Sequence, residues 1–135
     1  MSLFTRKLAF HIVLPLAAGV AIYIFFRQNT WFHYHFLPPG FHPIVLPRSP
    51  LNDVFIFNVP DFCWAYSLAS SLFYWGRIDR VRNRFFPVFV LLLIVTAESL
   101  QYFFSSRFTF DWIDLTAAIL AFLLSFLLNG RHEIA

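Results

Sequence analysis

Six polar side chains flank or interrupt the apolar stretches of this sequence, and they are of the types that bind ligands or transfer protons. The six are Asp61, Glu98, Gln101, Arg107, Asp111 and Asp114. Carboxylates accept hydrogen bonds, can act as acid or base catalysts, and can hold a divalent cation through oxygen. The guanidinium of Arg107 can bind phosphate or carboxylate through paired N–H groups. The same residues could instead form a structural network of hydrogen bonds and ion pairs, so binding, catalysis and helix locking all stay open.

The spacing of these residues predicts that they share helix faces. Glu98 and Gln101 are three residues apart, as are Asp111 and Asp114, and residues at that spacing lie on one side of a helix. Glu98 stands about six residues, or about 9 Å, inside its apolar stretch. A charged group at the centre of a bilayer costs about 2.5–3.5 kcal/mol. Glu98 should therefore point into the protein, either protonated or paired, and Arg107 is the nearest candidate partner by sequence.

Four apolar stretches must position these side chains, at about residues 8–26, 59–75, 85–104 and 112–128. A bilayer core of about 30 Å is crossed by roughly 17–25 helical residues, and all four stretches reach that length. Composition agrees, because 59% of the 135 residues are hydrophobic and only 13% are charged, against about 25% charged in soluble domains. We therefore predict a single all-α domain over residues 1–135, an integral membrane four-helix bundle. The first stretch could alternatively be a signal peptide, although it exceeds the usual apolar core of about 7–15 residues.

The basic residues predict the orientation of the bundle. One end of the helices carries seven basic and two acidic residues, namely Arg6, Lys7, Arg77, Arg80, Arg82, Arg84 and Arg131 against Asp79 and Glu133. The other end carries three basic and five acidic residues, namely Arg27, Arg48 and Arg107 against Asp53, Asp61, Glu98, Asp111 and Asp114. Because loops rich in Lys and Arg stay on the cytoplasmic side of a membrane, we predict both termini in the cytoplasm and the six polar residues at the outward face.

The segment between the first two stretches, residues 27–58, is predicted to be a long extracytoplasmic loop. Its five prolines exclude a continuous helix, and its aromatic part, residues 31–36, should lie on the membrane surface and cap the bundle. His33, His35 and His42 could bind a metal, but their aromatic and proline neighbours favour interfacial packing. We predict no metal site and no cofactor, and the sequence carries no phosphate-loop motif.

Small residues predict which helix faces pack together. Ala117, Ala121 and Ser125 are four apart in the last apolar stretch, and Ala65 and Ala69 are four apart in the second. Small residues at this spacing let helix backbones approach closely in lipid. We therefore expect these faces to be turned toward other helices.

The order and spacing of the polar residues resemble those of the VanZ-like family of small membrane proteins. The pattern consists of Glu98-x-x-Gln101, Arg107 and Asp111-x-x-Asp114 opening an apolar helix, with Pro60-Asp61 opening an earlier one. The resemblance covers about residues 58–128 and is that of a divergent member. Phe62, Ala65, Ala118 and Ala121 stand where the family commonly has Lys, His, Asn and Gly. The family is named for a protein associated with low-level teicoplanin resistance, so the resemblance implies a cell-envelope role and an effect on glycopeptide sensitivity.

The combined interpretation is a multi-pass protein of the cell inner membrane that binds a lipid headgroup or envelope component at an outward polar pocket. Arg107 would engage an anionic group, Glu98 and Gln101 would orient it, and the three aspartates would supply acceptors. Expected partners are membrane lipids, a lipid-linked envelope precursor, or a protein of a membrane complex, but not nucleic acid. Two alternatives stay open: an enzyme acting on a lipid-linked substrate through its carboxylates, and a structural subunit of a larger membrane complex.

Overall fold

The computed structural model describes residues 3–27, 31–38, 40–78, 85–103 and 112–130. All regular secondary structure within these ranges is helical. The prediction of an all-α fold is therefore confirmed for this part of the chain.

The first helical rod consists of α1 (Leu3–Leu8), the π-helical turn η1 (Ala9–Val13) and α2 (Leu14–Phe26). It ends at Arg27, whose backbone is extended (φ −87°, ψ 121°). The wide turn η1 ends shortly before Pro15, which has no N–H for a helical hydrogen bond and crowds the carbonyl one turn back. A π-helical turn at this point lets the rod continue past the proline.

The second rod consists of α4 (Pro50–Asp53), the π-helical turn η2 (Val54–Asn58) and α5 (Val59–Ile78). The sequence prediction placed its start near residue 59. The rod begins earlier because the Ser49 side chain accepts a hydrogen bond from the Asn52 N–H at 3.2 Å, and Pro50 occupies the first helical position. Both features are standard helix starts. As in the first rod, the π-helical turn is followed closely by a proline, here Pro60.

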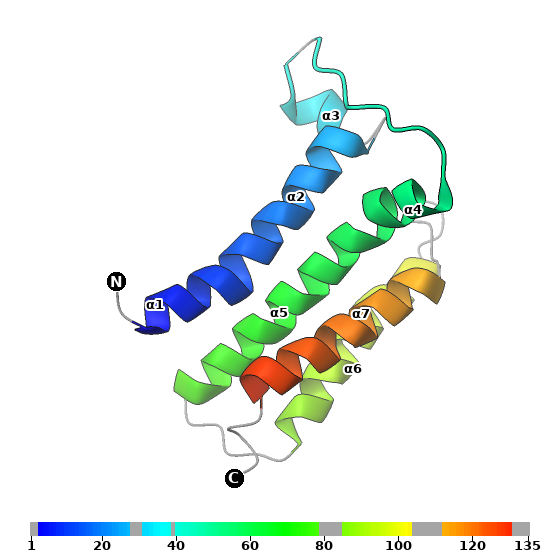
Figure 1. Ribbon diagram of the computed structural model, residues 1–135. Helices are drawn as coiled ribbons and strands as arrows, with labels where there is room; N and C mark the ends of the chain where they lie inside the picture. Colours follow the sequence, from blue (N-terminus) through cyan, green and yellow to red (C-terminus); the bar gives the residue numbers. More distant parts are fainter. Residues whose placement is uncertain (1–2, 28–30, 39, 79–84, 104–111, 131–135) are drawn as a thin grey trace.

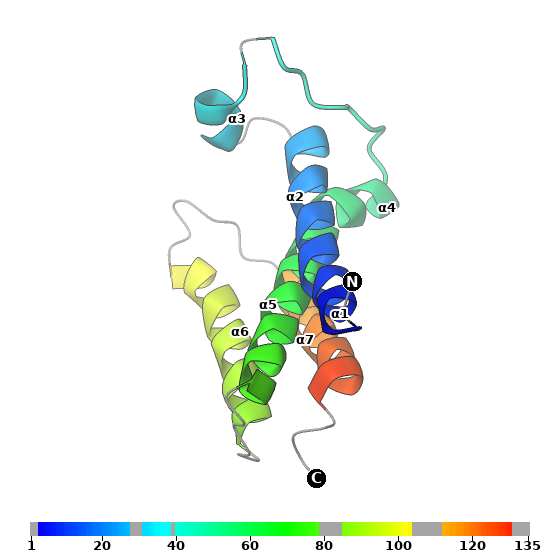
Figure 2. The same ribbon diagram turned by 90° about the vertical axis from the view of Figure 1, so that its left-hand side faces the viewer.

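Two more helices complete the bundle: α6 (Phe86–Phe103), and α7 (Trp112–Ser125), which continues into the π-helical turn η3 (Phe126–Gly130). Helix α5 is central, because it packs against α2, α6 and α7. Helices α2 and α6 lie on opposite sides of α5 and run antiparallel to it, whereas α7 runs parallel to it (Figure 1, Figure 2). The beginnings of α5 and α7 therefore lie at the same end of the bundle, together with the last turns of α2 and α6.

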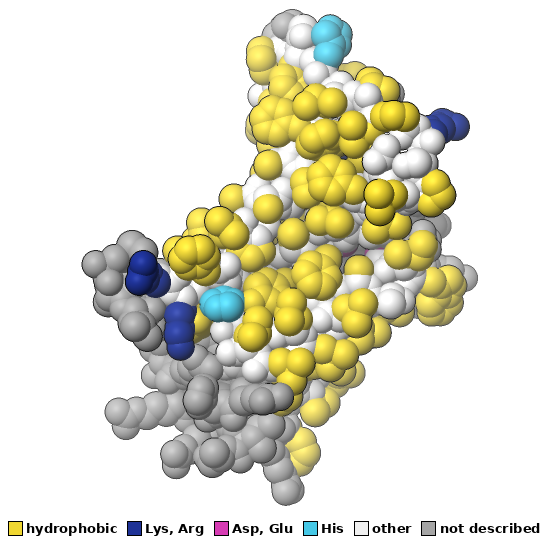
Figure 3. All heavy atoms as spheres, viewed as in Figure 1, with side chains coloured by type: hydrophobic (Ala, Val, Ile, Leu, Met, Phe, Trp, Pro, Cys, Tyr) yellow, Lys and Arg dark blue, Asp and Glu magenta, His cyan; other side chains and the backbone are white. Residues whose placement is uncertain are grey.

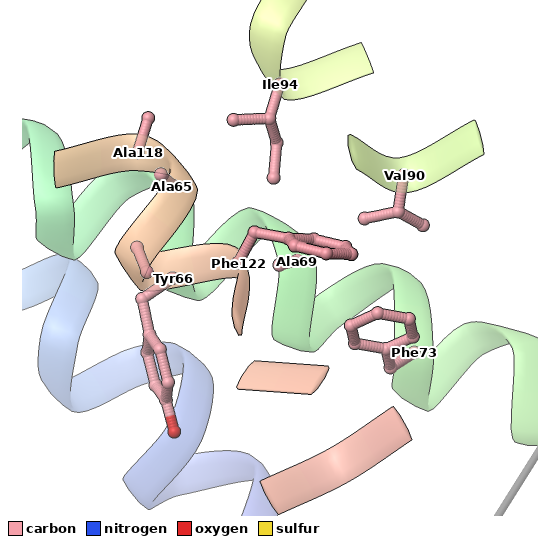
Figure 4. Close-up of a cluster of buried hydrophobic side chains, with 9 residues drawn as sticks. Ala65, Tyr66, Ala69, Phe73, Val90, Ile94, Ala118 and Phe122 are labelled. Atoms are coloured by element: carbon pink, nitrogen blue, oxygen red, sulfur yellow. The ribbon is translucent and has the colours of Figure 1, made fainter. Parts of the chain in front are cut away.

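The core lies where α5, α6 and α7 meet (Figure 4). Its buried members are Ala65, Tyr66, Ala69, Phe73, Val90, Ile94, Ala118, Ala121 and Phe122. Phe73 is fully buried, and its ring centre lies 6.4 Å from that of Phe86 on α6 and 6.0 Å from that of Phe122 on α7. Aromatic rings at these separations attract each other beyond their burial, so Phe73 ties the three helices together.

Helix α7 has small residues inside and large apolar residues outside. Ala118, Ala121 and Ser125 are fully buried. The opposite face carries leucines that are 41–55% exposed, namely Leu120, Leu123, Leu124, Leu127 and Leu128. The predicted stripe is confirmed at Ala121 and Ser125 and on α5 at Ala65 and Ala69, which are buried, whereas Ala117 is partly buried. Ala118, which was not among the predicted residues, is fully buried as well.

Many apolar side chains are exposed on the face of the bundle shown in Figure 3. Among the described residues, two helical spans are long and apolar enough to cross a membrane: Arg6–Phe26, with 21 residues, and Trp112–Asn129, with 18. The described side chains of α6 add a shorter apolar run, Phe86–Ala97. By length and composition, the first and last predicted membrane stretches are therefore fit to span a bilayer.

Candidate functional site

The structure brings the backbones of four predicted site residues to one end of the bundle. Asp61 lies in the first turn of α5 and Asp114 in the first turn of α7. Glu98 and Gln101 belong to the last part of α6, which ends on the same side (Figure 1). The predicted Arg107 and Asp111 lie outside the described residues.

A hydrogen bond at this end joins the last residue of η2, just before α5, to α7. The Asn58 side-chain amide Nδ2 donates to Asp114 Oδ1 at 2.5 Å. Asn58 is only 8% exposed, and a buried amide that donates a hydrogen bond avoids much of the penalty of leaving water. Asp61 follows Asn58 by three positions along one continuous helix, so the two side chains lie on the same face. The polar end therefore contains Asn58, Asp61 and Asp114 from two helices.

Sequence reasoning missed Asn58, which the structure places at this end, bonded to Asp114. The available signal was an amide inside an otherwise apolar run, three residues before Asp61 and two before Pro60. The turn η2 ends at Asn58. A π-helical turn changes the direction in which its residues point relative to a regular α-helix, and such turns are frequent at functional sites.

A close approach of α2 holds the first turn of α5 in place. A Cβ atom added to Gly19 would lie 3.0 Å from Cys63 Cβ and 3.2 Å from the Pro60 carbonyl oxygen. Only glycine leaves room for this contact. Pro60 is itself almost completely buried. Gly19 thus fixes the turn that carries Asp61, although it was not among the predicted packing residues.

A second polar cluster lies further along α5, toward the opposite end, and none of its members was predicted as a site residue. Ser70 Oγ and Ser125 Oγ are 2.9 Å apart, and the Asn129 amide donates to Ser70 Oγ at 3.3 Å. All three side chains are buried. Polar side chains that bond across helices in this way hold membrane helices in register. We interpret this cluster as structural.

The first rod is attached to α5 by two further polar contacts. His11 Nδ1 lies 2.6 Å from the Tyr66 hydroxyl, which points toward that rod in Figure 4. The Ser67 hydroxyl donates to the Ile12 carbonyl at 3.1 Å. Both contacts fall in or beside η1, where the π-helical geometry loosens the regular hydrogen-bond ladder. They fix the rotation of the first rod against α5.

The histidines of the long connecting segment do not converge on one point. His33 Nε2 donates to the Ile24 carbonyl at 2.8 Å, and its ring stacks on Phe41 with centres 5.8 Å apart. This contact satisfies a carbonyl that the end of α2 leaves without a helical partner. Among the side chains that the structure describes, no three from His, Cys, Asp and Glu are grouped to hold a metal.

No protein-family model, no curated protein and no solved structure matches this chain. The chemistry of the site therefore rests on its own geometry. Two carboxylates and an amide at one end of the bundle can accept hydrogen bonds from hydroxyls or amines and can attract cations.

Proposed function

We propose that this chain is a multi-pass protein of the cell inner membrane, with four crossings and both termini in the cytoplasm. The strongest support is the reversal of the usual polarity on α7, where alanine and serine are buried and leucines are exposed. In water this arrangement would leave a large apolar patch open to aggregation. In lipid it is favourable, because the surroundings are as apolar as leucine and only close packing holds helices together.

Helix α5 is the least apolar of the four proposed crossings, and its central position explains how it can cross. Its polar side chains Ser67 and Ser70 are buried against neighbouring helices, whereas Trp64, Leu68 and Trp75 are exposed. Lipid would therefore meet mainly apolar atoms of α5. The basic residues Arg6 and Lys7 are at the start of the first rod, where the positive-inside rule favours the cytoplasm.

Within this bundle, we propose that the polar end faces outward and binds a lipid headgroup or another envelope component. The hydrogen bond from Asn58 to Asp114 carries the proposal, because it joins the start of α7 to the turn that precedes Asp61, at the end opposite Arg6 and Lys7. Arg107 would engage an anionic group on the ligand, and Glu98, Gln101 and Asp111 would complete the pocket. Acidic residues within membrane helices are functional more often than not.

The VanZ-like resemblance extends this proposal to an effect on glycopeptide sensitivity. Two positions that depart from the family pattern, Ala118 and Ala121, are fully buried on the face of α7 that meets α5. Alanine at these positions lets the two helices pack closely, so the departures fall on the helix contact. They leave the acidic residues at the beginning of each helix unchanged.

The experiment is a complementation assay. The gene is deleted, single-residue variants are expressed in the deletion strain, and the antibiotic sensitivity of each strain is compared. Asp61→Asn and Arg107→Ala should reach the membrane at native yield but fail to return the cells' sensitivity to glycopeptides and lipid-targeting antibiotics to the level seen with the native protein. Arg48→Ala is the matched control, because Arg48 is an exposed arginine in the segment leading to the same end. It should restore sensitivity fully.

Each alternative function predicts a different result. If the protein is an enzyme, Asp61→Asn should be produced at native yield but no longer form its lipid product. If it is a structural subunit, the native protein should co-purify with a partner protein, and Asp61→Asn should be produced at reduced yield. If deletion of the gene leaves the whole antibiotic panel unchanged, the proposed envelope role is wrong.

A further inference from the structure

An apolar hollow lies between α2, the short helix α3 (Trp31–Phe36) and α5. Its volume is about 220 Å³, and its lining consists of Val20, Tyr23, Ile24, Phe32 and Trp64. Val20 is 37% exposed and Trp64 is 54% exposed, so the hollow opens onto the outer surface of the bundle. Pockets for whole small molecules measure about 300–1,000 Å³. The hollow therefore suits one part of a chain-like molecule.

The positively charged side chain of Arg27 lies at one end of this hollow. Val20, Tyr23, Ile24 and Arg27 follow one another at helical spacing, so Arg27 continues the stripe that lines the hollow. The guanidinium carbon of Arg27 lies 5.2 Å from the ring centre of Tyr23 and 5.3 Å from that of Phe57. The rings attract the cation but do not neutralise it. Within the described ranges, no carboxylate pairs with Arg27, so its N–H groups can bind an anion.

The wall of the hollow that α3 provides is fastened to the end of α2. His33 donates to the Ile24 carbonyl, and the Ile44 backbone N–H donates to the Phe25 carbonyl at 2.7 Å. Both bonds occupy carbonyls that lie beyond the helical ladder. The hollow is therefore formed before any ligand arrives, which lowers the ordering cost of binding.

We propose that this hollow and Arg27 form a binding site for one anionic phospholipid. A segment of an acyl chain fills the hollow, and the phosphate accepts hydrogen bonds from the Arg27 guanidinium. The position fits a lipid, because Arg27 lies just past the end of a membrane-length helix and aromatic rings surround it, as at a headgroup boundary. The inference shares with the proposed function only the membrane location, and it uses none of the polar-end residues.

The test uses Trp64 as a reporter, because its ring lines the hollow. Trp31, Trp75 and Trp112 are replaced by Phe, and the full chain is placed in phosphatidylcholine vesicles. Brominated phosphatidylglycerol or brominated phosphatidylcholine then quenches Trp64 fluorescence at equal mole fractions. We expect half-maximal quenching at about fivefold lower mole fraction of the anionic lipid, since one arginine near an anionic surface contributes about 1 kcal/mol.

Four further variants distinguish a specific lipid-binding site at Arg27 from non-specific electrostatic attraction between anionic lipids and the basic residues of the protein. Arg27→Gln should abolish the preference for the anionic lipid, and Arg27→Lys should retain it, which shows that the fold is intact. Arg48→Gln removes another arginine from the same connecting segment and should retain the preference. Val20→Phe fills the hollow and should weaken quenching by both lipids.

Three results would overturn the inference: equal quenching by the two lipids, a preference that survives Arg27→Gln, or a preference lost equally in Arg48→Gln. Failure of the polar-end proposal would instead appear as unchanged antibiotic sensitivity with the Trp64 preference intact. The two proposals can therefore fail separately.

Discussion

Gly19 offers the sharpest test of the helix packing. An added Cβ would lie 3.0 Å from Cys63 Cβ and 3.6 Å from Pro60 Cα. These atoms are close to the backbone and cannot swing aside, so α2 and α5 must separate. Overpacking costs about 1–3 kcal/mol, while replacing helical glycine by alanine returns about 0.5–1 kcal/mol. We expect Gly19→Ala to lower the free energy of unfolding by about 1 kcal/mol, and Gly19→Leu to lower it by more than about 3 kcal/mol.

The assay is reversible unfolding in mixed micelles, followed by circular dichroism. Ala18→Leu is the matched control, because Ala18 precedes Gly19 on the same helix but is exposed. It should leave the free energy of unfolding nearly unchanged. Cys63→Gly removes the atom nearest to the new Cβ, so Gly19→Ala should cost less in the Cys63→Gly background than in the native chain. Equal stability of Gly19→Leu and the native chain, or equal damage from Ala18→Leu, would refute the packing described here.

Two polar contacts between α5 and α7 yield further predictions. For Asn58 and Asp114, a double-mutant cycle with Asn58→Ala and Asp114→Ala should give a coupling of at least about 0.6 kcal/mol, the average for hydrogen bonds between membrane helices, whose maximum is about 1.7 kcal/mol. Additive effects would show that the bond is absent. For Ser70 and Ser125, each single change to Ala should destabilise by about 1 kcal/mol because it leaves a buried partner unsatisfied. The double change should cost less than the sum, as measured by the same unfolding assay, and a strictly additive result would contradict the 2.9 Å contact.

The sequence predicted the helical class and the common end of Asp61 and Asp114, because both follow from long apolar stretches with few interruptions. It placed the start of the second rod too late, because the prediction was based on where the apolar stretch begins and did not use the helix-capping residues Ser49 and Pro50. Asn52 and Asp53 also interrupt the apolar pattern there. The capping residues mark the observed start of this helix more accurately than the start of the apolar stretch does.

The pairing of polar side chains could not be predicted from the sequence. Successive residues on an α-helix differ by about 100° in direction, so a small error in helix rotation leaves out a packed residue such as Ala118, which is fully buried. The π-helical turns η1, η2 and η3 shift this rotation further, and each carries a polar residue that reaches another helix: His11, Asn58 and Asn129. Of the predicted site, Arg107 and Asp111 lie outside the described residues and stay predictions.

The most direct test of the central claim is the side of the membrane to which the polar end is exposed. The native Cys63 is first replaced by Ala, and Asp61→Cys or Lys7→Cys then provides a single thiol at either end of the bundle. Intact cells with a permeable outer envelope are treated with a maleimide that cannot cross the inner membrane. We predict labelling of Asp61→Cys in intact cells and labelling of Lys7→Cys only after the inner membrane is opened. The opposite pattern, or equal labelling of both variants in intact cells, would contradict an outward-facing polar site.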